Sequence, residues 1–466
     1  MRLHYPMRTV LVIGGGLGGL TTAYRLGSHA SVTVFEAQPR PGGNLRTTTS
    51  ADGFRVEWGP NGFLDGKPAT LQLCSDLGLG GQLVAASEGS RTNRYVYWNG
   101  KIEKLPGGPL GLLTTPLLSL RGKVELLAEP VRRRSKAGSP DESVRAFATR
   151  RMGKEAATVF MEALVTGVHA ADPGRLSVRA AFPRLAAFEA DAGSVFRGVM
   201  RGSKAKRRAA EARDEKPQPQ RMWSFPGGLQ TLVDALRDRL ADALVTGAAV
   251  KRLERRPDGR WRLTTDAGVH DADAVILTCP AHEQARLLAD TDSALAGELA
   301  GIGSNRIAVV ALGYRAADAP ALDGFGYIAP ISLKRDAIGV QWCSSIFPDR
   351  APPGFVLWRA LCGGELRPEL VDLDDDALVR RAHAEMRATM KVAGDPVFAQ
   401  VVRWPRAIPQ YHLGHLDRVA RIDAAVARWP GLFVTGNAFK GVAMNDVVEQ
   451  AGLTAARVLT MPSPSP

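Results

Sequence analysis

A glycine-rich segment near the N-terminus has the residue types and spacing that bind the phosphates of a dinucleotide. Gly14, Gly16 and Gly19 form the pattern GxGxxG between an apolar stretch, residues 10–13, and a helical pattern that begins at Leu20. Glycines here allow a tight turn, close approach of a pyrophosphate and close packing of the helix on the strand, whose N-terminal amides then face the phosphate. The segment therefore predicts dinucleotide binding, with a purely structural turn as the alternative.

An acidic residue follows at the distance this motif requires. Residues 31–35 alternate as a second strand and end at Glu36, which we expect to bind a ribose hydroxyl group. A glycine pair, Gly42 and Gly43, comes soon afterwards and indicates a further backbone segment beside the cofactor. The motif by itself does not distinguish FAD from NAD.

Other motifs typical of catalytic or metal-binding sites are missing from the sequence. It has no GxSxG elbow, Walker lysine or HExxH motif. His412 and His415 are three residues apart, and we expect them to pack rather than to bind a metal. The four cysteines have no metal-like spacing, which favours a reducing compartment. A cofactor that itself carries out a redox step would need none of these groups.

Length and charge restrict the class of protein. A chain of 466 residues predicts two or three domains, and its formal net charge of +13 favours acidic partners. Because no nucleic-acid motif is present, a lipid surface or an acidic small molecule is the better interpretation, against a generally arginine-rich composition. Residues 1–8 lack the apolar segment of a signal peptide, and no apolar run reaches the length of a membrane span. We therefore expect a cytoplasmic protein.

The elements at the two ends of the chain predict one α/β domain built from both. Residues 432–435 read as a buried strand that leads through Gly436 and Asn437 to a helix opening at 441–445. The backbone amides at this helix start are expected to meet the pyrophosphate or the flavin carbonyls. A strand–turn–helix at each end, with the buried strand 274–277, makes the middle of the chain an insertion.

The inserted middle predicts a second sheet and a helical part. Strands are expected at 305–314, 338–343, 355–362 and 398–404, with a helix from 374 to 390. A strand at 54–58 leads into a turn-rich loop, and residues 91–100 read as a hairpin. A helix is expected from 141 to 171, capped by Asp141, and a polar surface connection at 209–221.

An apolar segment, residues 105–120, is broken by prolines and glycines and cannot be a membrane-spanning helix. It is either a docking surface or an ordinary buried loop. Basic residues lie nearby in the sequence: Arg121, Lys123, Arg132, Arg133, Arg134, Lys136, Arg201, Lys204, Lys206, Arg207 and Arg208. This composition suits an anionic membrane surface, with a solvated charge run as the alternative.

Several stretches together resemble the amine-oxidase-type flavoproteins. They are the N-terminal motif, Glu36, Arg40-x-Gly42-Gly43 and the loop from Gly59 to Phe63. Within that superfamily the loop Gly-Pro-Asn-x-Phe is similar to that of oxygen-dependent protoporphyrinogen oxidases. Four later stretches agree: 93–97, 166–168 with 176–177, 347–352 and 408–411. The resemblance covers residues 9–457 and implies FAD as the cofactor, not NAD.

The resemblance also implies a domain plan. It gives a discontinuous Rossmann-like FAD-binding domain (1–91, 215–290 and 425–466), a helical membrane-binding insertion (92–214) and a mixed-sheet substrate domain (291–424). The fold class is thus α/β. Such a protein is expected to lie on the cytoplasmic face of the inner membrane as a peripheral protein, and a homodimer is compatible with it.

The implied reaction is oxidation of protoporphyrinogen IX to protoporphyrin IX by O₂, the penultimate step of haem biosynthesis. Six electrons leave the substrate and three hydrogen peroxide molecules form. Alternatives within the fold are oxidation of coproporphyrinogen III and another amine-oxidase-type flavin oxidase or desaturase. A membrane-associated flavin or porphyrin carrier is the non-enzymatic alternative. No catalytic acid or base is evident.

The resemblance assigns substrate contacts. Arg94 lies where an arginine binds a propionate, as the guanidinium fork can do in a bidentate way. Gly167 matches a glycine whose carbonyl group faces the macrocycle, and Ile328 and Leu361 match apolar residues on the pyrrole rings. Gln341 departs from a leucine of plant-like members, which leaves the substrate pose open.

The resemblance also assigns cofactor contacts, although Asn437 stands where many FAD proteins have an aspartate. The assigned residues are Gly14, Gly15, Gly16, Leu17, Gly18, Gly19, Glu36, Ala37, Arg40, Gly43, Asn44, Gly59, Pro60, Asn61, Gly62, Val250, Trp404, Val442, Ala443 and Met444.

Overall fold

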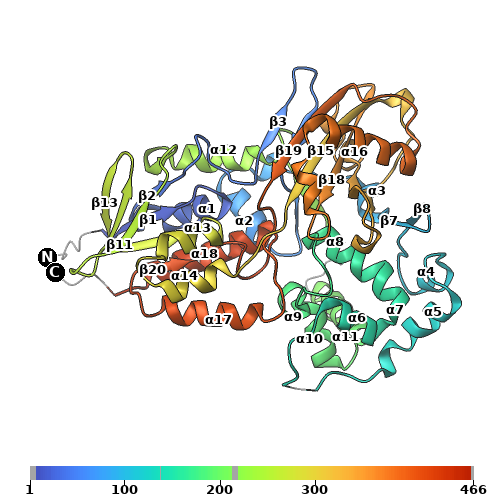
Figure 1. The fold of residues 1–466 in the computed structure, drawn as a ribbon, viewed down its shortest axis with the longest axis horizontal. Helices are drawn as coiled ribbons and strands as arrows, with labels where there is room; N and C mark the ends of the chain where they lie inside the picture. The colour runs from blue at the N-terminus through green and yellow to red at the C-terminus, as the bar shows by residue number, and fades with distance from the viewer. Residues whose placement is uncertain (1–6, 137, 213–218, 463–466) are drawn as a thin grey trace.

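A five-stranded parallel sheet organises one half of the computed structural model, which describes residues 7–136, 138–212 and 219–462. Its strand order is β10-β2-β1-β14-β20, and every neighbouring pair is parallel. The strands are Thr9–Ile13 (β1), Ser31–Phe35 (β2), Leu244–Val245 (β10), Ala274–Leu277 (β14) and Leu432–Val434 (β20). Segments from both ends and the middle of the chain thus lie side by side, as the sequence predicts (Figure 1).

Helices cover one face of this sheet. They are Leu17–Leu26 (α1), Ala69–Asp76 (α2), Gln230–Arg239 (α12) and Met444–Leu459 (α18). The apolar positions of α12, spaced by the helical repeat, enter the same buried cluster as the alternate residues Val10 and Val12 of β1. This packing fixes the N-terminal ends of α1 and α18 relative to the strands.

The opposite face is covered by a small antiparallel sheet and three helices. The strands are Arg252–Arg255 (β11), Trp261–Thr265 (β12) and Gly268–Ala272 (β13). The helices are Ala281–Leu288 (α13), Ser293–Ala300 (α14) and His415–Val426 (α17). The central strands β1 and β14 are buried on both faces, and residues 10–13 and 274–277 are accordingly apolar throughout.

A seven-stranded mixed sheet forms the second half, in the order β19-β15-β18-β17-β16-β7-β8. Its strands are Tyr95–Trp98 (β7), Lys101–Lys104 (β8), Ile307–Arg315 (β15), Gly326–Ile328 (β16), Ala337–Gln341 (β17), Phe355–Gly363 (β18) and Phe398–Trp404 (β19). The four strands predicted for this sheet are present, and Asp375–Met390 (α16) packs on one face. Pairing is antiparallel except between β16 and β7.

The β7–β8 hairpin belongs to this sheet, although its sequence lies inside the stretch expected to be the helical insertion. β7 pairs with the free edge of β16, opposite Tyr327 and Ile328. The ring of Tyr95 packs 5.2 Å from that of Trp342, and the ring of Tyr97 packs 6.2 Å from that of Tyr327. Sequence-local patterns cannot show which sheet edge a hairpin extends.

Shorter elements connect the two halves. They are Thr47–Thr49 (β3), Arg55–Glu57 (β4), Phe63–Leu64 (β5), Val84–Ala85 (β6), Met222–Ser224 (β9), Glu88–Thr92 (α3) and Cys343–Ile346 (α15). β3 pairs with β4, while β9 lies between β5 and β6. The predicted strand at 54–58 is therefore present as β4, and the loop that follows it joins the two halves.

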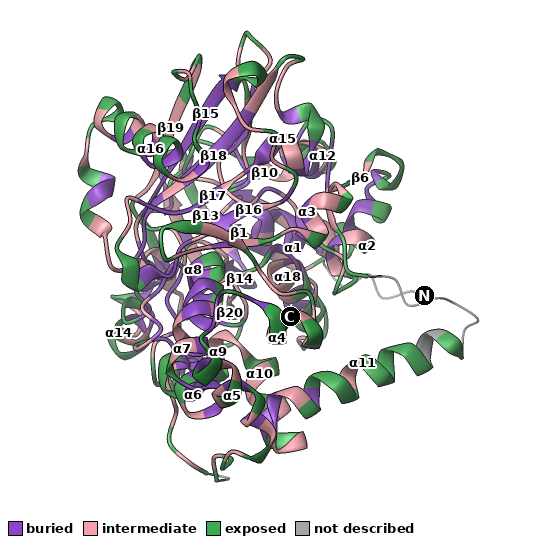
Figure 2. Cartoon of the chain, turned by 90° about the vertical axis from the view of Figure 1, so that its right-hand side faces the viewer, coloured by how far each residue is buried: buried purple, intermediate pink, exposed green. Residues whose placement is uncertain are grey.

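A helical part lies below the second sheet (Figure 1). Its elements are Pro109–Thr114 (α4), Leu120–Leu127 (α5), Val144–Met152 (α6), Lys154–Ala156 (α7), Ala163–His169 (α8), Val178–Ala181 (α9), Pro183–Ala192 (α10) and Val195–Glu211 (α11), with a π-helical turn at Ala157–Glu162. In the described residues no helix is long and apolar enough to cross a membrane. Figure 2 shows α11 extending away from the body, with most of its length exposed.

The single helix expected at 141–171 is wrong in two details. Gly153, with a φ of 87°, interrupts it, because this left-handed backbone ends α6. Ser143 rather than Asp141 caps it, accepting a hydrogen bond from the Ala146 amide at 3.2 Å. Asp141 instead accepts from the Ser177 hydroxyl at 2.9 Å. Of the polar connection expected at 209–221, residues 213–218 lie outside the described part of the chain.

Candidate functional site

The glycine turn after β1 forms a cradle of backbone groups. Gly14 has a φ of 111°, and its amide donates to the Phe35 carbonyl oxygen at 2.8 Å, which ties the turn to β2. A Cβ atom on Gly19 would lie 1.9 Å from the Gly14 oxygen, so only glycine lets α1 pack this closely. No side chain caps the α1 N-terminus after Gly16, and its first turn has no acidic residue. These uncapped amides, with Leu17 and Gly18 in the first turn, fit a phosphate.

Glu36 lies at the end of β2, beside this cradle. One carboxylate oxygen accepts from the Gly15 amide at 2.7 Å, and the other accepts from the Gln38 amide at 2.8 Å. The carboxylate therefore holds the glycine turn in place and lies next to the exposed Ala37. The ribose contact expected from the sequence stays a prediction.

The segment after Glu36 folds back onto the cradle. The Gly42 amide donates to the Gly15 oxygen at 2.7 Å, and a Cβ atom on Gly16 would lie 3.9 Å from the Gly43 Cα. Arg40 donates to the Gly43 oxygen at 3.2 Å. The glycine pair thus allows two backbone segments to run in contact, as the sequence predicts for a cofactor-lining turn.

Arg46 is a cationic residue of this region that the sequence reasoning missed. Its guanidinium lies 3.9 Å from the centre of the Trp58 ring, and that of Arg40 lies 5.7 Å from the same ring. Burial and, second, the charge of Arg46 lower the pKa of Arg40. The two cations favour a polyanion nearby, and the only sequence signal for Arg46 was its proximity to the glycine pair.

The loop Gly59–Gly62 lies between the cradle and the second sheet. A Cβ atom on Gly59 would lie 2.3 Å from the Asn44 oxygen, and one on Gly62 would lie 2.5 Å from the Trp223 oxygen. The Trp404 indole donates to the Trp58 oxygen at 2.9 Å. The loop, with Pro60 in it, is thus fixed from several sides, and the cofactor contacts expected of Asn44 and Trp404 stay a prediction.

Buried polar side chains hold this loop from behind. The Asn61 amide nitrogen donates to Oε1 of Gln341 at 2.8 Å. Arg359 donates to the same oxygen from Nε at 3.1 Å and to the Gly59 oxygen at 2.8 Å. Burial lowers the pKa of Arg359. Gln341, expected to contact substrate, has its oxygen fully used within the protein, and Arg359 had no signal in the sequence.

A buried ion pair supports the strand before the loop. Glu57 and Arg350 are 3.5 Å apart and both about 2% exposed at the side chain. Glu57 also accepts from Thr47 at 2.8 Å and from the Leu229 amide at 2.9 Å. Burial raises the pKa of Glu57, against the opposing effect of Arg350 and these hydrogen bonds.

The C-terminal helix begins beside the same loop. Ala443 is the residue before α18, Met444 is buried as its first residue, and Val442 packs on the helical part. Asn445 accepts from the Thr70 amide at 3.3 Å and donates to the Leu64 oxygen at 2.5 Å, joining α18 to α2 and β5.

Val250, an assigned cofactor contact, and Asn437 each make a main-chain contact with another part of the protein. Val250 is buried in the cluster under β11–β13, and its carbonyl oxygen accepts from Arg286 at 2.7 Å. The main-chain oxygen of Asn437 accepts from the Tyr411 hydroxyl at 2.5 Å. An adenosine contact at Val250 therefore stays a prediction.

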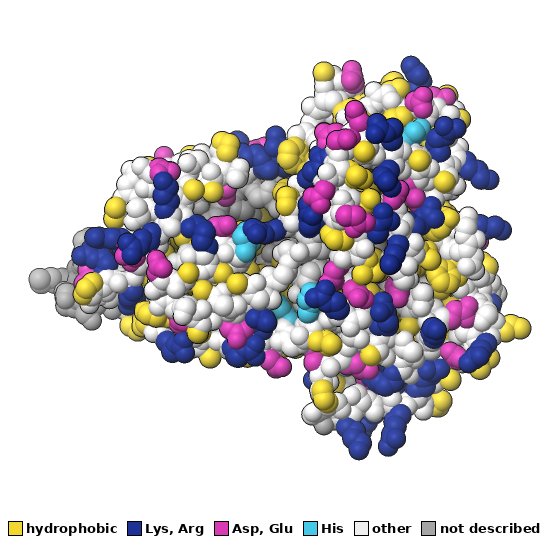
Figure 3. Space-filling model, in the orientation of Figure 1, with side chains coloured by type: hydrophobic (Ala, Val, Ile, Leu, Met, Phe, Trp, Pro, Cys, Tyr) yellow, Lys and Arg dark blue, Asp and Glu magenta, His cyan; other side chains and the backbone are white. Residues whose placement is uncertain are grey.

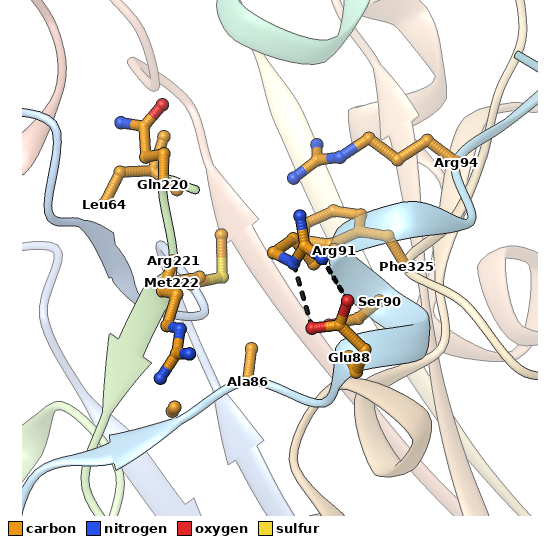
Figure 4. A pocket seen from close by; sticks show the side chains of 11 residues that line it. Leu64, Ala86, Glu88, Ser90, Arg91, Arg94, Gln220, Arg221, Met222 and Phe325 are labelled. Carbon is orange, nitrogen blue, oxygen red and sulfur yellow. Dashed lines mark hydrogen bonds and ion pairs between the residues drawn. The ribbon is translucent and has the colours of Figure 1, made fainter. Parts of the chain in front are cut away.

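Arg94 lines a cavity of about 240 Å³ between β5, β9 and α3 (Figure 4). Its guanidinium lies 4.5 Å from the centre of the Phe325 ring, and partial burial of this group lowers its pKa, although the residue as a whole is exposed. No carboxylate in the described residues forms an ion pair with it, whereas Arg91 in the same wall pairs with Glu88. A cation without a protein partner in a cavity fits an acidic ligand.

Gly167 and Ile328 lie against each other. A Cβ atom on Gly167, in α8, would lie 2.7 Å from Cδ1 of Ile328, in β16. Leu361 lies on β18, two residues from Arg359, and packs against the cluster that contains Trp58 and Trp404. Leu164 and Val168, also on α8, are 40% and 39% exposed.

The residues present fit FAD. The cradle, Arg40, Arg46 and the loop Gly59–Gly62 form one continuous region joined by the contacts above, and the uncapped start of α1 provides amides for phosphate. Among the described residues no cluster of His, Cys, Asp or Glu could hold a metal ion. The arrangement can bind a flavin dinucleotide and place an acidic, largely apolar ligand beside it.

Comparisons with known proteins agree with this geometry. Residues 17–459 match the family described as flavin containing amine oxidoreductase. The chain is 33% identical to bovine (Bos taurus) protoporphyrinogen oxidase over 477 residues, covering 97% of this chain and 98% of that protein. It is 30% identical to Bacillus subtilis coproporphyrinogen III oxidase, with the same two coverages. A crystal structure from Exiguobacterium sp. 255-15, of a protein named as a candidate protoporphyrinogen oxidase, superposes with a TM-score of 0.83 at 25% identity, over 97% of this chain and 98% of that one.

Proposed function

This chain belongs to the flavin-containing amine oxidoreductase family, and we propose that it is the member that oxidises protoporphyrinogen IX to protoporphyrin IX with O₂. It is an FAD-dependent oxidoreductase. The observation that carries the substrate assignment is Arg94: its guanidinium has no carboxylate partner among the described residues and lines a cavity whose wall, at Leu64, directly follows the Gly59–Phe63 loop. Relatives named for porphyrinogen oxidation, about one third identical over nearly the whole chain, support it.

When bound, FAD would supply a two-electron acceptor for the substrate that O₂ can reoxidise. The chain's own residues bind and orient. The α1 amides and Arg40 hold the pyrophosphate, and the loop Gly59–Gly62 fixes the position of the ring. Arg94 holds a propionate, so that the macrocycle lies against Ile328 and Leu361. Gly167 keeps space open, since any side chain there would meet Ile328.

Coproporphyrinogen III is the second candidate substrate. A specific observation favours it: the cavity of Arg94 also contains Arg91 and Arg221, against the single carboxylate of Glu88. This excess of positive charge suits a ligand with more than one carboxylate. The Bacillus relative, as similar as the animal ones, is named for this activity.

Porphyrin fluorescence tests both substrates directly. The purified protein in mild detergent is mixed in air with protoporphyrinogen IX or coproporphyrinogen III, and the enzyme-free rate is subtracted because both compounds autoxidise. Faster appearance of protoporphyrin supports the proposal. A clear preference for coproporphyrinogen III supports the second candidate substrate. If the protein binds FAD and neither porphyrinogen is oxidised faster than without enzyme, both candidates are rejected.

We further propose that the helical part docks on an anionic membrane. Leu110, Leu120 and Val131 are each 80% exposed or more, on or beside α4 and α5. Basic side chains lie on α5 and along the exposed α11, and Figure 3 shows Lys and Arg gathered at the lower edge of this part. Apolar groups ringed by cations suit anionic headgroups.

Vesicle sedimentation tests this surface. The protein is expected to sediment with vesicles containing phosphatidylglycerol and to be released by salt. The variant Leu110→Ser/Leu120→Ser should lose most of this binding. Leu453→Ser, which changes an exposed leucine on α18 in the other half, is the matched control. Equal binding of all three proteins would reject the proposal.

A further inference from the structure

A buried positive charge lies directly behind the loop Gly59–Gly62. The side chain of Arg359 comes from β18, and the residue is 2% exposed. Its guanidinium donates to the main-chain oxygens of Glu57 and Gly59 and to Oε1 of Gln341. All three acceptors are uncharged. An arginine stays protonated in a protein, so this charge is permanent.

The nearby carboxylates are engaged elsewhere. Glu57 forms its ion pair with Arg350 at 3.5 Å. Asp349, 37% exposed at the side chain, pairs with Arg350 and with Arg55, each at 3.2 Å. Among the described residues, Arg359 therefore has no carboxylate within ion-pairing distance. The charge of Glu57 still acts on Arg359 and partly opposes the effect of burial on its pKa, but no carboxylate bonds to it directly. Burying a charge without such a direct partner is costly.

Gln341 fixes this charge against the loop. Its Oε1 accepts two hydrogen bonds from Arg359 and one from Asn61, at 2.8 Å. Because all three partners are donors, the oxygen and not the amide nitrogen must occupy this position. A leucine, which the family resemblance leads one to expect here, could not accept them. Gln341 and Arg359 thus act as a pair.

We propose that Arg359, held by Gln341, stabilises the reduced, negatively charged form of the flavin ring and so raises the reduction potential of the cofactor. The inference rests on the proposed placement of that ring beside Gly59–Gly62. Taking up two electrons and one proton leaves the ring with one more negative charge than before. A fixed cation nearby favours that form. In this arrangement Arg359 tunes the cofactor, and Gln341 is a positioning residue.

Four variants separate the effect of the charge from that of packing. Arg359→Met removes the charge but leaves buried acceptors without donors, whereas Gln341→Leu leaves the guanidinium without its acceptor. Arg359→Met/Gln341→Leu removes both partners and keeps an apolar volume, which costs less stability than either single change. Arg359→Lys keeps the charge and loses the planar fork. Arg403→Met is the control, since Arg403 binds Asp375 and the Val371 oxygen on the other face of the same sheet.

Reducing the FAD-loaded proteins to equilibrium together with a reference dye measures the reduction potential of the flavin. No porphyrinogen is needed for this measurement. At a fixed dye potential, the ratio of reduced to oxidised flavin should fall about tenfold in the double variant, which is about 30 mV for a two-electron couple. Arg359→Lys should stay within about threefold of the wild type, because one unit charge at a similar distance acts similarly. Arg403→Met should not change the ratio.

Each outcome bears on a different claim. The role of the charge is overturned if the ratio of reduced to oxidised flavin is unchanged in the FAD-saturated double variant. It is also overturned if this ratio is as low in Arg359→Lys as in Arg359→Met. A shifted ratio in an enzyme that oxidises neither porphyrinogen leaves this inference standing and rejects the proposed substrate. A wild-type protein that binds no FAD overturns both.

Discussion

At the scale of single residues, Arg94 is expected to decide substrate binding. Replacing it by alanine should lower kcat/KM for protoporphyrinogen IX at least tenfold, about 1.4 kcal/mol of transition-state stabilisation, because the cavity then lacks this cation. The kcat/KM of Arg94→Lys should lie between those of the wild type and of Arg94→Ala, since lysine keeps the charge and loses the bidentate fork. Initial rates by porphyrin fluorescence measure this.

The matched control for Arg94 is Arg239→Ala. Arg239 is an exposed arginine at the end of α12, outside the cavity. It should leave the kinetic constants unchanged and so show that lowering the net charge by one has no general effect. If Arg94→Ala and Arg239→Ala had the same kcat/KM, the propionate contact would be rejected.

Some residues of this site could be predicted from the sequence and others could not, and the chemistry of each residue type explains why. The glycines of the cradle could be found because their roles require glycine at fixed spacing. Arg46 and Arg359 could not, because an arginine is usually a surface residue and its partners here are brought from distant strands. Gln341 stood out only as a departure from the family, and its role became visible only with Asn61 and Arg359 beside it.

At the scale of elements, the contact between α1 and the β1 turn is expected to control cofactor retention. Gly19→Ala places a Cβ atom 1.9 Å from the Gly14 oxygen, so α1 must move away and its amides leave the phosphate site. We expect the variant to lose most of its co-purifying FAD. The ratio of flavin to protein absorbance measures the loss.

Gly452→Ala is the control for a glycine replaced in a helix. A Cβ atom there has no atom within 4 Å, so the change should retain FAD and stabilise α18 by about 0.5–1 kcal/mol. Full FAD retention by Gly19→Ala would show that α1 tolerates the displacement and that its amides do not determine binding.

Strands and helices with a clear apolar repeat could be predicted from the sequence, whereas the elements with which they pair could not. Apolar patterning along short stretches predicts α16 and most strands of the two sheets, but not the short strands β10 and β16. The edge that β7 joins, the break at Gly153 and the cap at Ser143 depend on neighbours far along the chain or on one backbone angle. These features arise from tertiary packing, which local propensity does not encode.

At the scale of the whole molecule, His169 lies where the helical part meets the two halves. Its carbonyl oxygen accepts from Asn305 at 2.8 Å and from Gln410 at 3.1 Å. Its ring packs against Phe182 and Tyr411, with His415 stacked on the far side of Tyr411. Nδ1 has no hydrogen-bond partner, and burial lowers the pKa of His169 to about 4. The folded protein therefore keeps this imidazole neutral in the neutral and mildly acidic range.

This buried imidazole predicts a loss of stability in mild acid. The unfolded chain binds a proton at His169 below about pH 6.5, but the folded protein does so only near pH 4, so the unfolding free energy falls as pH drops through this window. Between pH 7 and pH 5 this one group should contribute a loss of about 2 kcal/mol. Urea unfolding of the wild type and of His169→Gln at both pH values measures it, because the other titrating groups are common to the two proteins. The variant should lose about 2 kcal/mol less than the wild type on acidification, and an equal loss in both would show that folding does not lower the pKa of His169.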